Sequence, residues 1–360
     1  MAKIIYGVAG EGFGHSSRSH LIGRRLLDAG HDVMFVGSRK SLTYLKQYFA
    51  ERVREIFGLS FAFEDGRIDK SETLKQNLMR IPEGNRQNDE LFKRYFEPFA
   101  PDLIISDFEP FSAWWAWRNR VPFISIDHEH VLTLCELEPV KGNWFSRVTA
   151  SVFTEFYYVG AVAYVLINFF KAPLRAETAL LAPPVVRPVV ASLTPTCEGH
   201  VVVYSTSAAG REQLIETLGR FPDYRFHVYG FDRSEETGNC LFKERSTEGF
   251  LTDLASCRGV IASAGFSLIS ECMYLRKKML LLPIKGQYEQ IMNAHYARKL
   301  GLGVSSPRLD ESSIRQFSDE LAKPVPVADD ILWPDNDKCF DVVQQALNRL
   351  PMPVNLALRA

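Results

Sequence analysis

The chain has 360 residues, of which 46% are hydrophobic and 24% charged, a composition typical of a globular protein with room for two domains. The formal net charge is −1 and no basic run stands out, which argues against nucleic acid as a partner because phosphate binding needs clustered lysine and arginine. The six cysteines form no CxxC pair. Their scatter argues against a zinc site or a disulfide framework and indicates a reducing, cytoplasmic environment.

No segment of the sequence has the character of a membrane span. The first residues enter a strand directly, without the apolar core of a signal peptide. The longest uncharged stretch, Phe156 to Phe170, is shorter than the roughly 18 apolar residues that a span requires, and it contains Gly160 and Asn168. It reads as a helix end followed by a buried strand, and peripheral contact with a membrane surface stays open.

The first half of the chain alternates between strand and helix patterns. The apolar run Lys3–Ala9 predicts a strand buried on both faces, followed by a glycine-rich loop up to Gly14. Helical spacing over Ser16–Ala29 and a strand at Asp32–Val36 complete a βαβ unit of a parallel sheet. We expect later strands at Leu103–Ser106, Pro122–Ile126, Ala161–Asn168 and Val185–Val190, a helix at Phe111–Arg118, and helices with a mobile loop in the charged segment Glu64–Tyr95.

The pattern restarts after a proline-rich boundary between Pro188 and Gly199. Strands are expected at His200–Tyr204, Arg225–Gly230, Val260–Ser263 and Met279–Pro283, with a small-residue loop at Ser205–Gly210 and helices at Arg211–Arg220, from Ser267, from about Gln287 and at Asn336–Leu350. We therefore predict an α/β protein of two Rossmann-like, doubly wound parallel-sheet domains, residues 1–190 and 191–335, that face a cleft. The closing helix, within 336–360, is expected to cross back to the first domain.

A glycine-rich run leads into the first helix and ends in His15. Its spacing is G-x-G-x-G and not G-x-G-x-x-G, and no acid follows the second strand, so NAD and FAD are disfavoured and no cofactor is expected. Ligands of doubly wound sheets bind at the carboxyl edge, where a neutral His15 is suited to act as a general base. The alternative is a helix-capping or structural histidine. The same run offers the cleft candidates Glu11, Gly12, Gly14 and Arg18.

Acids and histidines end two further strands of the first domain. Asp107 follows Leu103–Ser106 and is placed to hold His15 in one tautomer; it is equally suited to be the N-cap of the next helix. Asp127, His128 and His130 follow the strand at Pro122–Ile126. No further ligand pattern converges on them, so we interpret them as polar lining of the cleft, and no metal site is expected.

The stretch from Gly259 to Glu271 predicts a short strand, a turn of small residues and a helix start. Ser263, Gly265 and Ser267 allow close approach of a ligand, and the free N–H groups of the helix suit a diphosphate without lysine or metal. Glu271 lies about one turn later, where a carboxylate can bind two ribose hydroxyls. The alternative is an ordinary connection between a strand and a helix.

A second polar helix start follows the strand that ends at Pro283. It presents Gln287, Glu289, Gln290 and Asn293. Amides and carboxylates each make several hydrogen bonds, which is what sugar hydroxyls require. Its alternative interpretation, a polar first turn with favourable capping, becomes weaker beside the Gly265 turn and Glu271.

Taken together, these motifs resemble the GT-B superfamily of nucleotide-sugar glycosyltransferases, in the branch of the UDP-glycosyltransferases and the N-acetylglucosaminyltransferase of peptidoglycan synthesis. The resemblance covers nearly the whole chain and depends on the six-residue offset from Gly265 to Glu271 and on Glu289-Gln290-x-x-Asn293. Two departures are Ser263, where plant members often have histidine, and a longer spacing from proline to acid, which leaves the role of Gln287 open. The His15 run is more similar to a little-studied microbial branch.

The resemblance implies roles for the residues of both halves. Gly265, Phe266 and Ser267 would hold the diphosphate, Glu271 the ribose, Glu289 and Gln290 the donor sugar, and Phe250 would lie by the base. His15 would be the acceptor base and Asp107 its partner acid. The segment Glu64–Tyr95 and the helix with Trp114, Trp115 and Trp117 would shape the acceptor pocket.

These inferences predict an inverting, metal-independent hexosyltransferase that moves a sugar from a nucleoside diphosphate, with UDP favoured over TDP or GDP, to an acceptor hydroxyl. The acceptor, a small molecule, glycan or lipid, is not specified by the sequence. A nucleotide-sugar epimerase on the same fold is the first alternative, with Glu11, Asp127, His128 and His130 around the sugar. A nucleotide-sugar-binding protein without catalysis is the second.

Overall fold

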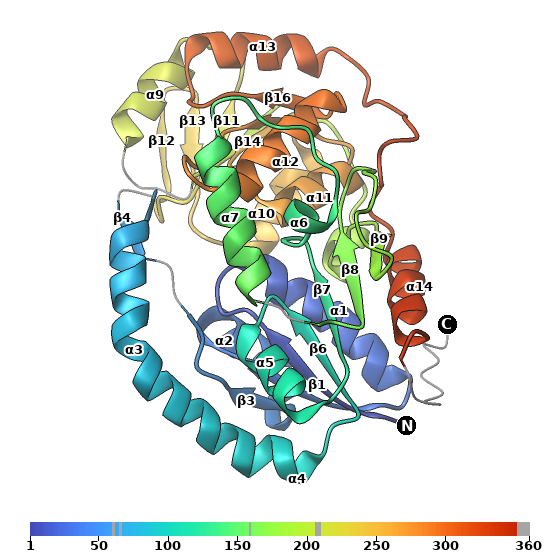
Figure 1. The fold of residues 1–360 in the computed structure, drawn as a ribbon. Helices are drawn as coiled ribbons and strands as arrows, with labels where there is room; N and C mark the ends of the chain where they lie inside the picture. The colour runs from blue at the N-terminus through green and yellow to red at the C-terminus, as the bar shows by residue number, and fades with distance from the viewer. Residues whose placement is uncertain (60–61, 65–66, 158–159, 206–209, 351–360) are drawn as a thin grey trace.

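The computed structural model describes residues 1–350 apart from 60–61, 65–66, 158–159 and 206–209, so four residues of the predicted loop Ser205–Gly210 lie outside the described part. Two seven-stranded sheets, each flanked by helices, organise the molecule (Figure 1). The first sheet has the order β3-β2-β1-β6-β7-β8-β9, and all its neighbours pair in parallel. Its strands are β1 (Lys3–Val8), β2 (Asp32–Gly37), β3 (Val53–Glu55), β6 (Leu103–Asp107), β7 (Phe123–Asp127), β8 (Ala163–Ile167) and β9 (Ala179–Ala182).

The second sheet has the order β12-β13-β11-β10-β14-β15-β16 and is parallel except for the β12–β13 pair. Its strands are β10 (Val201–Tyr204), β11 (Phe226–Tyr229), β12 (Glu235–Thr237), β13 (Cys240–Phe242), β14 (Gly259–Ala262), β15 (Lys278–Leu281) and β16 (Gly303–Ser305). A two-stranded hairpin, β4 (Ala62–Glu64) with β5 (Arg67–Asp69), lies apart from both sheets. The predicted pair of doubly wound α/β sheets is thus confirmed.

Helices cover both sheets because each presents an apolar stripe to strands that are apolar on both faces. In the first half these are α1 (Phe13–Asp28), α2 (Arg39–Phe49), α3 (Lys70–Leu91), α4 (Glu97–Phe99), α5 (Pro110–Asn119), α6 (Val131–Leu134), α7 (Trp144–Tyr157) and α8 (Pro188–Ala191), with a 3-10 turn η1 (Ala50–Arg52) and a π-helical turn η2 (Phe92–Phe96). In the second half they are α9 (Arg211–Gly219), α10 (Thr247–Ser256), α11 (Phe266–Tyr274), α12 (Tyr288–Lys299), α13 (Glu311–Leu321) and α14 (Asn336–Leu347). None of the helices in the described part of the chain is both long and apolar enough to cross a membrane.

Three predicted elements differ from the structure. The strand expected at Val185–Val190 is wrong: the last strand is β9, and Pro188 begins the short helix α8, because proline at a first helical position loses no hydrogen bond. The first helix begins at Phe13 and not at Ser16, which puts His15 in its first turn. In the charged segment Glu64–Tyr95 the structure has an expected helix, the 22-residue α3, and before it the hairpin β4–β5, which was not predicted.

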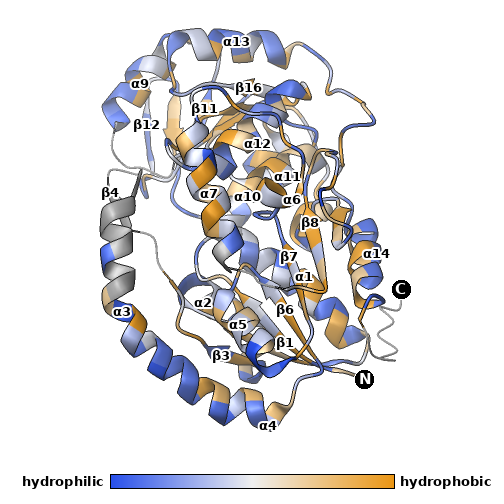
Figure 2. Ribbon diagram, viewed as in Figure 1, coloured by the Kyte–Doolittle hydropathy of each residue, from blue (hydrophilic) through white to orange (hydrophobic). Residues whose placement is uncertain are grey.

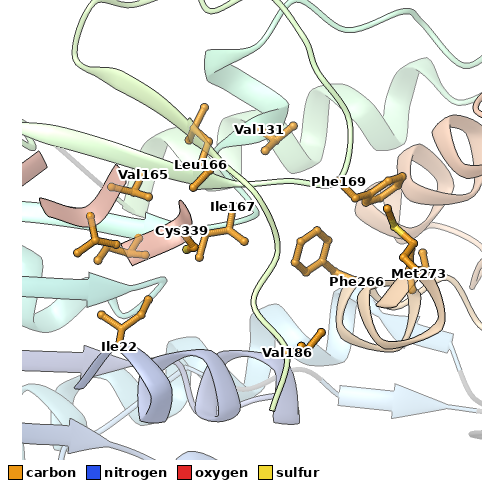
Figure 3. Packing of buried hydrophobic residues seen from close by; sticks show 14 of the residues in the cluster. Ile22, Val131, Val165, Leu166, Ile167, Phe169, Val186, Phe266, Met273 and Cys339 are labelled. Atoms are coloured by element: carbon orange, nitrogen blue, oxygen red, sulfur yellow. The ribbon is translucent and has the colours of Figure 1, made fainter. Parts of the chain in front are cut away.

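The two halves share one hydrophobic core. Figure 3 shows Phe169, which follows β8, beside Phe266 of α11, and their ring centroids are 6.2 Å apart. Ile22 of α1 and Val186 belong to the same buried cluster. The chain then returns from the second half to the first: α14 contacts β8 and β9, and the side chain of Asn336 bonds both backbone groups of Val186. Residues 351–360 of the predicted closing segment lie outside the described part.

Candidate functional site

The carboxyl edges of the two sheets face each other, and the starts of α1 and α11 meet between them. A Cβ atom added to Gly14 would lie 2.4 Å from the Oγ atom of Ser267. A side chain at position 14 would therefore displace the hydroxyl of Ser267, so glycine lets the first turn of α1 approach α11 this closely with Ser267 in its observed position. In each sheet this edge includes the point where the strand order reverses, between β1 and β6 and between β10 and β14, where ligands of doubly wound folds bind.

His15 and Asp107 form a bonded pair at this edge. The Nδ1 atom of His15 lies 2.7 Å from Oδ1 of Asp107, and Asp107 is completely buried at the end of β6. The same carboxylate accepts hydrogen bonds from Nε of Arg18 at 2.8 Å and from Oγ of Ser19 at 3.0 Å. Four donors thus fix Asp107, counting both guanidinium nitrogens of Arg18. A carboxylate held in this way orients the ring of His15.

The structure rejects the alternative in which Asp107 caps the next helix. Glu109 is the N-cap of α5, and its carboxylate accepts from the backbone N–H groups of Phe111 at 3.0 Å and Ser112 at 2.8 Å. Between the two acids, Phe108 has a positive φ of 54°, which is uncommon for a bulky residue. Its ring stacks on His15 with centroids 6.3 Å apart. The turn therefore directs one acid toward His15 and the other toward the helix.

Glu129 bonds the other nitrogen of the same histidine. Its Oε1 atom lies 3.2 Å from Nε2 of His15, and its Oε2 atom accepts from the backbone N–H of His128 at 3.1 Å. Burial lowers the pKa of His15, but Glu129 and Asp107 outweigh it and raise the pKa to about 10. Burial raises the pKa of Glu129, but the charge of His15 outweighs this effect and lowers the pKa to about 2. His15 is thus an imidazolium between two carboxylates, and Glu129 was missing from the predicted site.

The other residues of the segment Asp127–His130 divide between two places. Asp127 and His130 form a buried pair, with Oδ2 of Asp127 2.7 Å from Nδ1 of His130. Burial raises the pKa of Asp127, but His130 outweighs it, so this pKa lies below its usual range. His128 instead contacts the second half: its Nε2 atom lies 2.9 Å from Oδ1 of Asn293, and its ring stacks on Phe266 with centroids 3.9 Å apart.

The start of α11 is open toward the gap between the halves. Gly265 is the N-cap, and α11 has no side-chain capping hydrogen bond. A Cβ added to Gly265 would meet no atom of the described residues within 4 Å. Ser263 and Ser267 are partly exposed on either side, whereas Phe266 is buried. No side chain therefore caps the first backbone N–H groups of α11 in the described structure, and uncapped groups at a helix start are suited to bind an anion.

Arg187, which sequence reasoning did not identify, pairs with Glu271. Its Nε atom lies 2.8 Å from Oε1 of Glu271. Burial raises the pKa of Glu271 and Arg187 opposes this effect, with the net pKa above its usual value. Both residues line a small cavity that takes residues from both halves: Gly14, Ser17, Arg18, Leu21, Val185, Arg187, Phe266, Ser267, Ser270 and Glu271.

The start of α12 places Glu289 against the acids of the first half. Burial and the nearby charge of Glu129 raise the pKa of Glu289 to about 7. Asn293 joins the two halves further, because its Nδ2 atom donates to the carbonyl of Ala264 at 3.2 Å and to Glu289 at 3.4 Å. His15, Glu129 and Glu289 thus form one charged group across the gap.

Other predicted site residues lie in structural contacts. Gln290 accepts from the backbone N–H of Ile284 at 3.0 Å and donates to Gln287 at 2.7 Å, so both amides brace the loop before α12. Glu11 accepts from Arg39 of α2 at 2.9 Å, which turns its carboxylate to α2 and not to His15. The last two are Gly12, which caps α1 with φ 84°, and Phe250, whose ring packs edge-on to Tyr204 and Tyr229.

Among the residues that the structure describes, two triplets bring potential metal-ligand atoms within 4.8 Å of one another. They are His15, Asp107 and Glu129, and His200, His227 and Asp253. In each triplet a cation already bonds the aspartate, Arg18 in the first and Lys243 in the second. Both are therefore networks of ion pairs in which the carboxylate is neutralised by a side chain.

Known proteins resemble this chain in sequence and in fold. The sequence model of the family "Glycosyl transferase family 1" matches residues 2–322 of this chain. Two uncharacterized glycosyltransferases are similar, one from Methanosarcina mazei, 31% identical over 130 residues, and one from Methanosarcina acetivorans, 32% identical over 131. These matches cover 35% of this chain and 33% and 32% of the two relatives, so the chain spans about a third of their length.

Solved structures extend the likeness to the whole fold. The calicheamicin glycosyltransferase CalG4 has a TM-score of 0.60 and 14% identity, over 97% of this chain and 95% of its own. LpCGTa in complex with UDP has a TM-score of 0.61 and 15% identity, over 96% and 94%. SsfS6 of Streptomyces sp. SF2575, complexed with thymidine diphosphate, has a TM-score of 0.59 and 14% identity, over 96% of this chain and 100% of its own. These structures share the GT-B fold, and the chain belongs to glycosyl transferase family 1.

Proposed function

We propose that this protein is a glycosyltransferase that moves a sugar from a nucleoside diphosphate, a UDP-sugar by preference, to an acceptor hydroxyl with inversion and without a metal. One observation carries the proposal: the pair of partly exposed His15 and buried Asp107 faces the open start of α11 across the contact of Gly14 with Ser267. A base and an anion site are thus within reach of one bound molecule.

The donor would bind to α11 and α12. The start of α11 at Gly265 suits a diphosphate, because its N–H groups and its dipole favour negative charge. Arg187 adds a positive side chain to the same cavity and is paired with Glu271, the proposed ribose ligand. Glu289 would contact the donor sugar. UDP and thymidine diphosphate are the nucleotides bound in two of the related structures, and both fit this assignment.

Chemistry would begin at His15. An acceptor hydroxyl must reach Nε2 of His15, so it has to replace Glu129, which bonds that atom at 3.2 Å. With Glu129 displaced, the strongest influence that keeps His15 protonated is lost, so the imidazolium releases its Nε2 proton to solvent and the neutral ring can then take the proton of the acceptor hydroxyl. Asp107 steadies the imidazolium that forms. A single displacement at the anomeric carbon inverts it, while the start of α11 and Arg187 stabilise the departing diphosphate.

The test measures nucleotide release and nucleotide binding in parallel. A thermal-shift screen of UDP, TDP and GDP identifies the base, since a ligand at about 100 times its Kd stabilises the folded state by about 2.7 kcal/mol. UDP-sugar turnover is then compared between wild type, His15→Ala and Asp107→Asn, with and without EDTA. We expect turnover to fall at least about 100-fold in both variants, UDP binding to persist, and EDTA to have no effect. Full turnover in His15→Ala would show that the base assignment is wrong.

Epimerisation of a nucleotide sugar is the second candidate. The observation in its favour is that Glu129 and Glu289 lie around one histidine, and that the pKa of Glu289 is raised to about 7, which suits a group that both gives and takes protons. Incubation with UDP-N-acetylglucosamine and no acceptor separates the two activities. A new isomer without nucleotide release supports the epimerase. Binding with no turnover of either kind supports a sugar-nucleotide-binding protein without catalysis.

A further inference from the structure

Arg18 contacts both members of the pair formed by His15 and Asp107. It lies three residues after His15 on α1, so the two side chains share one face of the helix. Its Nε atom donates to Oδ2 of Asp107 at 2.8 Å and its Nη2 atom to Oδ1 at 2.5 Å. A guanidinium binds a carboxylate most strongly in this two-pronged arrangement. Arg18 is 5% exposed and Asp107 is fully buried, so each charge has the other as its main partner.

Two cations meet at one oxygen atom of Asp107. Its Oδ1 atom lies 2.7 Å from Nδ1 of His15 and accepts from Nη2 of Arg18, and these two nitrogens are only 3.2 Å apart. A protonated His15 therefore lies against the positive charge of Arg18 as well as the negative charge of Asp107. Because a nearby like charge disfavours the charged form of a group, Arg18 opposes the protonation of His15.

The strands beside this contact are apolar. β6, which carries Asp107, is buried along its whole length, as is β7 next to it, and β8 beyond them has the hydrophobic colour in Figure 2. Water screens charges little in such a place, so they act on one another more strongly than at a surface. Burial lowers the pKa of Arg18, but Asp107 outweighs burial and holds this pKa above its usual value. Arg18 therefore stays charged.

Several carboxylates face His15 and Arg18. They are Asp107 of β6, Asp127 of β7, Glu129 after β7 and Glu289 of α12. Asp127 is itself bonded to His130. Further titratable neighbours are Tyr6, His128 and Cys339. Burial is the main cause of the pKa shift of these three, upward for the phenol and the thiol and downward for the imidazole, so they are uncharged at neutral pH. The charges that act on His15 are therefore those of Arg18 and of the carboxylates.

Arg18 balances the carboxylate that remains bonded to His15 when Glu129 leaves. In the proposed transfer an acceptor hydroxyl replaces Glu129 at Nε2 of His15, while Asp107 stays at Nδ1. Without Arg18, the unmatched charge of Asp107 would continue to hold the proton on the ring. We propose that Arg18 is a positioning residue that matches the charge of Asp107 and thereby lets His15 become neutral and act as the base. This inference rests on the proposed function, in which His15 takes the proton of the acceptor.

The test is an NMR titration of the His15 ring in protein without substrate. The background is Glu129→Gln, which removes the carboxylate as an acceptor would and brings the titration to lower pH. In this background Arg18→Gln should raise the pKa of His15 by at least about one unit, because the charge of Asp107 is then unmatched. Arg18→Lys keeps the charge and should raise this pKa by less than about half a unit. Arg24→Gln is the matched control and should change nothing, since Arg24 is an exposed arginine of the same helix that pairs with Asp28.

Turnover of a UDP-sugar at saturating acceptor gives a second readout. The kcat profile then reports the complex in which the acceptor has replaced Glu129. Its acid limb should move to higher pH by about one unit in Arg18→Gln and stay in place in Arg18→Lys, with KM for the donor changed less than about twofold in both. A residue that served the structure alone would lower kcat by the same factor at every pH.

Two results would overturn the proposal. One is a pKa of His15 that is unchanged or lower in Arg18→Gln, and the other is an equal rise in Arg18→Lys, which would show that charge is not responsible. Thermal unfolding of each variant checks that it is folded.

Should Arg18→Gln not fold, the double variant Arg18→Gln/Asp107→Asn removes both buried charges together. In the same background its His15 pKa should fall by less than about one unit, because the two lost charges nearly cancel, and a larger fall would contradict the proposal. UDP binding is measured on the same samples. A wild type that does not bind UDP would count against the proposed transfer site, whereas the titration of His15 decides the role of Arg18 without any ligand.

Discussion

Replacing Glu129 with glutamine tests the electrostatic account of His15. The substitution keeps the shape of the side chain and removes its charge, 3.2 Å from Nε2 of His15. At that separation an effective dielectric constant of about 20 gives an attraction of about 5 kcal/mol. Since 1.4 kcal/mol corresponds to about one pKa unit, the full loss would lower the pKa by about 4. Relaxation of the pair reduces the effect, and we expect the pKa of His15 to fall by at least about 2 from its value of about 10.

The assay is an NMR titration of protein labelled in its histidine rings, with the His15 signal assigned from its loss in His15→Asn. The matched control is Glu11→Gln, because Glu11 bonds Arg39 and not His15. A raised histidine pKa stabilises the fold below the unfolded value of about 6.5, and that stability is lost as pH rises through the folded pKa. In Glu129→Gln the loss should therefore occur at lower pH. An unchanged pKa of His15 would refute the account.

Three further substitutions test the contacts between the halves. Arg187→Ala leaves the buried Glu271 without its partner and should lower the free energy of unfolding by about 2 kcal/mol, measured in denaturant. Gly14→Ala places a Cβ 2.4 Å from Oγ of Ser267 and should weaken UDP binding about tenfold, measured by calorimetry. An acid whose pKa is raised in the folded state destabilises the fold when the pH is above that pKa. It has no such effect when the pH is below the pKa of the acid in the unfolded chain. Glu289, with a pKa of about 7, should accordingly make Glu289→Gln more stable than wild type by about 2 kcal/mol at pH 8 and equal to it at pH 4.

Each of these changes has a control and a contradicting result. Arg187→Lys keeps the charge, so it should retain part of the lost stability; equal loss in both variants would mean that packing and not charge is responsible. Gly219→Ala adds a Cβ where no described atom lies within 4 Å, so it should leave UDP binding unchanged. Normal UDP binding in Gly14→Ala would show that the close contact of α1 with α11 is dispensable. A stability difference for Glu289→Gln that does not vary with pH would contradict the raised pKa.

The fold could be predicted from the sequence because its strands are short apolar runs with glycine and polar residues between them. β1 and β6 were expected within two residues of their observed ends. Elements at the periphery were harder. The strand predicted at Val185–Val190 failed because apolar side chains there serve the core from an irregular segment and from α8, so hydrophobicity alone did not reveal the geometry. Helices were expected in the charged segment that holds α3, but the polar composition of α3 and its internal Pro82 left the bounds of the helix undefined.

For the site, the sequence indicated which residues are candidates and at which strand and helix ends they lie. It did not indicate which partner each of their side chains bonds. Asp107 could be assigned to either of two roles until the structure showed that Glu109 takes the capping role. In Asp127–His130, successive side chains point in different directions at a strand end, so spacing could not tell that Glu129 reaches His15 while Asp127 turns to His130. Arg187 lies in a segment without a motif, and its contact with Glu271 joins residues 84 positions apart.

The charges at the site have a further consequence for how a donor binds. The proposed base is bonded to Glu129 and the proposed ribose ligand to Arg187, so both groups are neutralised by partners within the protein. A donor and an acceptor must therefore exchange partners with these ion pairs rather than enter a site of unpaired charges. Such exchange costs less than desolvating an isolated ion, and it leaves Arg187 available for the diphosphate when ribose hydroxyls take Glu271. The order of binding that we expect is therefore donor first and acceptor second. A nucleotide sugar frees Arg187 and then binds to it, whereas an acceptor alone gains no new partner by displacing Glu129.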